Sequence, residues 1–138
     1  MTQLIFEIGI GVMWAAVMLL VAVKTVWPWR FLALSLVIAA LIYVLFPLLF
    51  GGSSTWVLIE LAGLLLYGSF ALLGLRHSPL WIAVGWGLHV LWDLVLHSSG
   101  PGSEFVPAWY PGVCLGVDLT LAAGIVLLRK YAQKVSVQ

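Results

Sequence analysis

Charged residues are scarce in this chain of 138 residues, of which only 8% are Asp, Glu, Lys or Arg and 64% are hydrophobic. A soluble domain of this size needs more polar surface than that, so the composition excludes one. The net charge is only +1, and no basic stripe runs between aromatic residues, which argues against a nucleic-acid partner. A single cysteine, Cys114, excludes an intrachain disulfide framework.

The chain contains several long apolar runs. Each run has about twenty residues, the length that crosses a hydrocarbon core as a helix. Turn-forming sequences rich in Gly, Pro and Ser separate them. The predicted spans are residues 4–27, 31–50, 55–75, 80–98 and 112–128. The sequence therefore predicts an all-α fold, with residues 1–138 forming one integral membrane bundle of five transmembrane helices.

The basic residues indicate how this bundle is oriented. All Lys and Arg residues flank the first connection, lie in the third connection or follow the fifth span: Lys24, Arg30, Arg76, Arg129, Lys130 and Lys134. Cytoplasmic segments carry the excess of basic residues in membrane proteins. We therefore expect the N-terminus outside and the C-terminus in the cytoplasm, in a multi-pass protein of the cell membrane, the inner membrane in a bacterium.

Acidic residues occupy the opposite half of the predicted bundle. Four of them lie inside spans: Glu7, Glu60, Asp93 and Asp118. Even a lenient insertion scale penalises an aspartate at the centre of the bilayer by roughly 2.5–3.5 kcal/mol. Four such residues on different helices would hardly persist facing lipid, so we expect them to face one another around a polar site.

The segment "GWGLHVLWDLVLH" supplies the ligand types for such a site. His89, Asp93 and His97 follow one another at intervals of four, which predicts one stripe on an α-helix. The two histidines are about 12 Å apart along the axis, too far to share one ion without distortion of the helix. We expect Asp93 and one histidine to bind a divalent metal such as zinc, and Asp118 to complete the site.

The other histidine then binds a second ion or acts as an acid or base. Asp93, His97 and Glu60 are the candidates for proton transfer. For the predicted cavity wall we name Glu7, Trp86, Trp92 and Cys114. Cys114 is also explained by packing alone, because Gly112 and Gly116 have the spacing that brings membrane helices close together. His97 near the end of a span is also compatible with an interfacial residue.

This part of the chain resembles a family of small bacterial integral membrane proteins known only as a domain of unknown function. The shared pattern is Gly-Trp, a His, a Trp-Asp pair, a second His, a Gly and Cys-x-x-x-Asp. The positions that fall on it are Trp86, His89, Trp92, Asp93, His97, Gly100, Cys114 and Asp118. The chain departs from it at Leu96, where members often carry a further histidine, and in a longer outer loop. The resemblance implies no activity.

Three functions fit these residues. The first is a metal-dependent membrane enzyme that acts on a lipophilic small molecule or lipid in the outer half of the bilayer. The second is metal-free acid/base isomerisation or cyclisation of a terpenoid-like or sterol-like lipid. The third is a proton or metal transporter, or a small-ligand binder, although polar residues thin out toward the inner face. The glycine-rich faces would also allow a homodimer.

Overall fold

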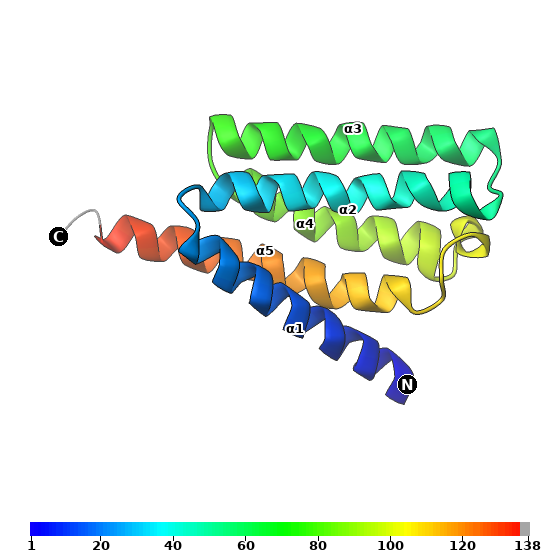
Figure 1. Cartoon of the computed structure of the whole chain (residues 1–138), viewed down its shortest axis with the longest axis horizontal. Helices are drawn as coiled ribbons and strands as arrows, with labels where there is room; N and C mark the ends of the chain where they lie inside the picture. The colour runs from blue at the N-terminus through cyan, green and yellow to red at the C-terminus, as the bar shows by residue number, and fades with distance from the viewer. Residues whose placement is uncertain (136–138) are drawn as a thin grey trace.

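The computed structural model describes residues 1–135, and it contains five long helices (Figure 1). Each of the five spans, with α4 and η1 counted together, is long and apolar enough to cross a membrane, and residues 1–135 contain no strand. In chain order the elements are α1 (Thr2–Lys24), α2 (Pro28–Phe50), α3 (Ser54–Arg76), α4 (Leu80–Trp92), the π-helix η1 (Asp93–Ser98), the 3-10 helix η2 (Pro101–Glu104) and α5 (Tyr110–Val135). The predicted all-α bundle of five membrane-length helices is confirmed. Its orientation stays a prediction.

Helix α4 has the most neighbours in the bundle. It packs against α3 and α5, while α2 lies along α3 and α1 lies along α5. The contact between α1 and α2 is much smaller, because α1 slopes away from α2 toward its N-terminus (Figure 1). Residues of α4 can therefore meet side chains from both the α2–α3 pair and the α1–α5 pair.

Two glycines set the close contact of α1 with α5. A Cβ atom on Gly116 would lie 3.0 Å from the backbone nitrogen of Val12 and 3.1 Å from the Cα atom of Gly11. A Cβ atom on Gly11 would in turn collide with the backbone of Val113. Small residues at such a crossing let two membrane helices touch through their backbones. Packing of this kind fixes the rotation of α5, and with it the direction of Asp118.

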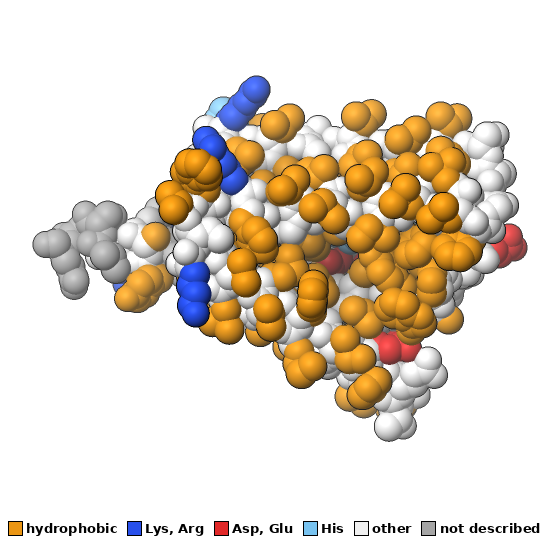
Figure 2. Space-filling model, in the orientation of Figure 1, with side chains coloured by type: hydrophobic (Ala, Val, Ile, Leu, Met, Phe, Trp, Pro, Cys, Tyr) orange, Lys and Arg blue, Asp and Glu red, His pale blue; other side chains and the backbone are white. Residues whose placement is uncertain are grey.

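The interior of the bundle is divided along its length. The half near the basic turns has an apolar core: Ala15, Ala22, Leu32, Leu36, Ala71, Ile82, Leu121 and Ile125. The buried charged or ionisable side chains all belong to the other half: Glu7, Glu60, His89, Asp93, His97 and Asp118. On the face drawn in Figure 2, basic side chains gather at the end near the C-terminus, and acidic ones appear toward the other end.

The glycine contact gives a stability prediction. Gly116→Ala should destabilise the protein by about 1–3 kcal/mol, because the new methyl group meets backbone atoms that cannot yield without separating the helices. Gly9→Ala is the matched control, since a Cβ atom there has no neighbour within 4 Å. Thermal unfolding in detergent, followed by circular dichroism, measures both. Equal behaviour of the two variants would contradict the proposed close packing.

Candidate metal and acid–base site

The polar site is built around a change of helix type. Helix α4 continues at Asp93 as a π-helix that runs to Ser98. A π-helix is hydrogen-bonded from i to i+5 and so has more residues in each turn than an α-helix. His97 is therefore rotated away from the position that a regular helix would give it. The predicted single stripe is divided, and His97 faces a different neighbour from His89 and Asp93.

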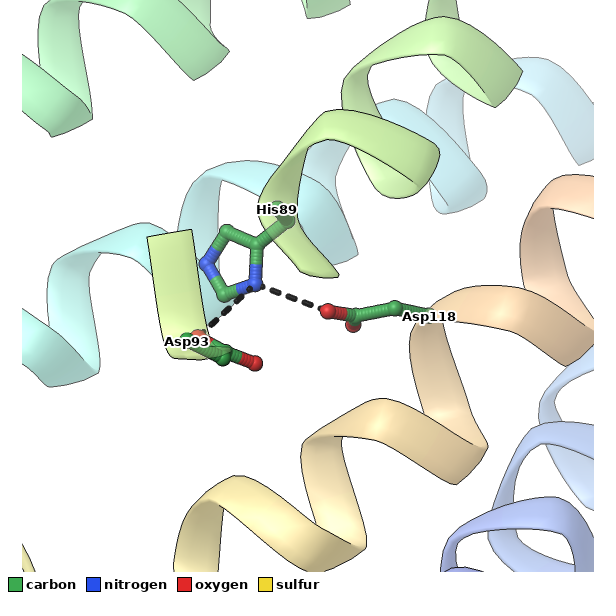
Figure 3. Close-up of side chains that lie close together, drawn as sticks. All are labelled: His89, Asp93 and Asp118. Atoms are coloured by element: carbon green, nitrogen blue, oxygen red, sulfur yellow. Dashed lines mark hydrogen bonds and ion pairs between the residues drawn. The ribbon is translucent and has the colours of Figure 1, made fainter. Parts of the chain in front are cut away.

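His89, Asp93 and Asp118 form the first group, which we call the aspartate–histidine cluster. The Nδ1 atom of His89 lies 3.0 Å from Oδ2 of Asp118 and 3.5 Å from Oδ1 of Asp93 (Figure 3). Each residue offers one ligand atom, and these three atoms all lie within 4.8 Å of one another. All three side chains are buried. Two carboxylates and one imidazole at this separation can hold a metal ion.

Asp93 is the least satisfied residue of this cluster. Its exposed fraction is 0%, and neither of its carboxylate oxygens has a hydrogen-bond partner among the described residues. The Nε2 atom of His89 also lacks one. A buried polar group without a partner costs about 1–3 kcal/mol, and a charged one costs more. The cluster therefore needs a proton or a cation to compensate Asp93.

Glu60, Trp92 and His97 form the second group, the glutamate–histidine pair with its tryptophan. The Nε2 atom of His97 lies 2.9 Å from Oε1 of Glu60. The indole Nε1–H of Trp92 donates to the other oxygen, Oε2, at 3.1 Å. Both carboxylate oxygens of Glu60 are thus engaged, which fixes its orientation. The Nδ1 atom of His97 has no hydrogen-bond partner among the described residues.

Tyr43 of α2 lies between the two groups. Its ring stacks on the ring of His97 with centroids 4.3 Å apart, and its centroid is 5.5 Å from that of His89. The side chain is 1% exposed, and its hydroxyl has no hydrogen-bond partner among the described residues. We did not assign Tyr43 to the site from the sequence. The sequence feature that could have indicated Tyr43 is its hydroxyl group in the middle of an apolar span.

The loop after η1 covers the glutamate–histidine pair. Phe105 and Val106 are buried against Tyr43, and the Phe105 ring centroid is 6.2 Å from that of His97. Gly102 lies so close to His97 that a Cβ atom there would be 2.8 Å from Cδ2 of the imidazole. The sequence predicted an outer loop at this place and gave no indication that it folds inward.

The residues predicted to form the cavity wall have different contacts in the structure. Trp92 binds Glu60, as described above. Trp86 is buried with its ring centroid 6.3 Å from that of His89, and its indole nitrogen has no partner among the described residues. Cys114 is buried on α5, beside Tyr43 and Tyr110. These residues surround the cluster.

Glu7 lies elsewhere. It accepts a hydrogen bond of 2.8 Å from Nε2 of Gln3, one turn before it on α1, and it packs against Gly112 of α5. No described hydrogen bond or ion pair joins Glu7 to the two groups. The structure therefore places Glu7 at the contact between α1 and α5.

The sequence profile of a family of unknown function, DUF6010, matches residues 2–129. The chain belongs to this family. The expected resemblance to a family of unknown function is thereby confirmed, and the matched range includes every residue of both polar groups. No curated protein and no solved structure matches the chain. For this member of DUF6010, the chemistry must therefore be argued from the side chains.

The unsatisfied carboxylate gives a prediction that is opposite in sign for two aspartates. In the presence of a chelator, Asp93→Asn should raise the free energy of unfolding by about 1–3 kcal/mol, because it removes a buried carboxylate charge that accepts no hydrogen bond. Asp118→Asn should lower it, because it weakens the hydrogen bond with His89. Thermal unfolding with a chelator present measures both. A destabilised Asp93→Asn protein would show that Asp93 has a stabilising partner of its own.

Proposed function

We propose that this protein is a metal-dependent membrane enzyme whose ion is held by His89, Asp93 and Asp118. The observation that carries the proposal is the state of Asp93, which is buried beside an imidazole and a second carboxylate, with no hydrogen bond to either of its oxygens. A divalent cation would compensate both carboxylates at once. Zinc fits this set of nitrogen and oxygen ligands, although other divalent metals share them.

The number of protein ligands favours catalysis over a purely structural role. Structural zinc sites are closed by four protein ligands, whereas catalytic sites use three and keep a position open. Here the protein offers three. An ion in this cluster would acidify a water molecule or polarise a substrate oxygen.

The glutamate–histidine pair supplies the group that moves a proton. Glu60 orients His97 through the 2.9 Å contact at Nε2, and Trp92 holds Glu60 in place. This leaves Nδ1 of His97 to take up or deliver a proton, with Glu60 stabilising the charged imidazole. Tyr43, stacked on His97, separates this pair from the metal ligands and offers its hydroxyl to a substrate between them.

A lipophilic substrate suits the surroundings of this site. A narrow crevice among α2, α3 and α4 leads along the polar groups and has no room for a water molecule as it stands. Its lining is Ala40, Tyr43, Glu60, Gly63, Leu64, Tyr67, His89 and Trp92. Leu64 and Trp92 are partly exposed on the outside of the bundle. A small lipid that displaces such apolar side chains would reach the site directly from the bilayer.

Metal-free acid/base chemistry is the second candidate, and the contact of His89 with Asp118 favours it. At 3.0 Å, Nδ1 of His89 and Oδ2 of Asp118 are close enough for a proton to pass between them. Crowded carboxylates in an apolar interior readily retain protons, so a proton can replace the ion at Asp93. Such a site would isomerise or cyclise a terpenoid-like or sterol-like lipid, with the surrounding aromatic rings stabilising cationic intermediates.

Transport fits the structure less well. A path for protons or ions across the membrane needs polar groups along its whole length. In the half of the bundle near the basic turns, the buried side chains of the described core are hydrophobic, and none of them is charged. The polar site therefore ends inside the bundle.

Metal content distinguishes the first two candidates. Wild-type protein purified in detergent should contain about one divalent ion per chain, and Asp93→Asn should lose it, because the amide offers no charge to the ion. Elemental analysis by mass spectrometry measures this. A chain without metal that is active on a lipid would overturn the metal proposal and favour acid/base chemistry.

Turnover should separate the proton carrier from the metal ligands. His97→Ala should keep its metal and lower the rate roughly 10²-fold or more, the usual contribution of a general acid or base. Glu104→Gln, an exposed change in the covering loop, is the control and should leave the rate unchanged. Lipid species are followed by mass spectrometry in nanodiscs made from the host membrane. Loss of metal from His97→Ala would assign His97 to the ligands instead.

A further inference from the structure

We propose that the basic end of the bundle holds a second site, which binds the phosphate headgroup of an anionic phospholipid. This site is independent of the metal centre and lies at the other end of the molecule. Its basis is a cavity of about 440 Å³ between the α1–α2 turn and the α3–α4 turn. The residues that line it are Val26, Trp27, Pro28, Trp29, Arg30, Gly74, Leu75, His77 and Pro79.

The charge of this cavity is positive. Arg30 and His77 supply donors for an anion from two different turns. The guanidinium carbon of Arg30 lies 4.8 Å from the centroid of the Trp27 ring, a cation–π contact that keeps the charge at the mouth of the cavity. None of the five Asp and Glu residues of the sequence lies in these turns. An anion placed here therefore meets attraction without an opposing carboxylate.

The backbone at the start of α2 adds to this attraction, against the partial negative charge of the carbonyl ends of α1 and α3 at the same edge. Helix α2 begins at the cavity with Pro28, and no side chain caps its first turn. The first backbone N–H groups of a long helix carry partial positive charge and are a common binding site for phosphate. An anion in this cavity would thus interact with the start of α2, with Arg30 and with His77. Arg30 also provides a planar set of donors that suits phosphate oxygens.

The position of the cavity at the edge of the predicted membrane spans favours a lipid over a soluble anion. It lies where α1 and α3 end and where α2 and α4 begin, which is the edge of the predicted spans. Val26 and Trp27 beside it are exposed apolar residues, and tryptophan collects at the level of lipid headgroups. Basic pockets between membrane helices on the cytoplasmic side bind anionic headgroups. The acyl chains would then run along the apolar outer faces of the helices.

Native mass spectrometry of the full chain in detergent tests this site, with phosphatidylglycerol and phosphatidylcholine of identical acyl chains as probes. The wild-type protein should bind phosphatidylglycerol more tightly. Arg30→Gln should weaken that binding about fivefold, the effect of one basic residue on an anionic lipid. Adding His77→Gln to this variant should weaken the binding further. Arg30→Lys, which keeps the charge, should retain most of the affinity.

Arg129→Gln is the matched control, because it removes one positive charge from the same end of the bundle without touching the lining of the cavity. Equal losses in Arg129→Gln and Arg30→Gln would overturn the proposal in favour of diffuse attraction. Equal binding of the two lipids would also overturn it. Displacement of phosphatidylglycerol by equimolar glycerol phosphate would overturn the lipid assignment and leave a site for soluble phosphates. Unchanged thermal midpoints verify that each variant is folded.

Discussion

The buried carboxylate of Asp93 is the feature on which the polar half of this protein depends. A negative charge in an apolar interior is tolerated only when other groups compensate it. His89 and Asp118 are brought to it from two different helices, yet neither completes a hydrogen bond with it. Two carboxylates and one imidazole leave an excess of negative charge. The missing compensation is the reason why the cluster is interpreted as a site for a cation or a proton and not as a structural contact.

The π-helix gives the site two separate parts. If α4 continued as a regular helix, His97 would extend the stripe of His89 and Asp93. The additional residue per turn directs it to Glu60 on α3 instead. The continuous helix of α4 and η1 thereby directs His89 toward Asp118 of α5 and His97 toward Glu60 of α3. Tyr43 occupies the space between them and contacts both imidazole rings.

The apolar core and the buried polar groups lie in opposite halves of the bundle. The half near the basic turns is held together by small, aliphatic and aromatic side chains without a buried charge. A tight apolar core at that end separates the site from the basic side of the membrane. At the other end, Phe105 and Val106 fold inward from the loop and cover the site. The polar groups are thus enclosed at both ends, and under the proposed function a lipid would enter between the helices from the side.

Composition and spacing determined the five membrane spans, the basic end and the burial of Asp93 and Asp118, because the cost of placing polar groups in an apolar medium depends only on residue type and position. The pairing of these residues was decided by tertiary structure. His97 binds Glu60, and Tyr43 joins the site, because each helix has a particular rotation about its axis and α4 changes its hydrogen-bond pattern at Asp93. Close backbone packing, as at Gly116, sets such rotations. The spacing of Gly112 and Gly116 predicted a close helix contact, but it did not identify α1 as the partner.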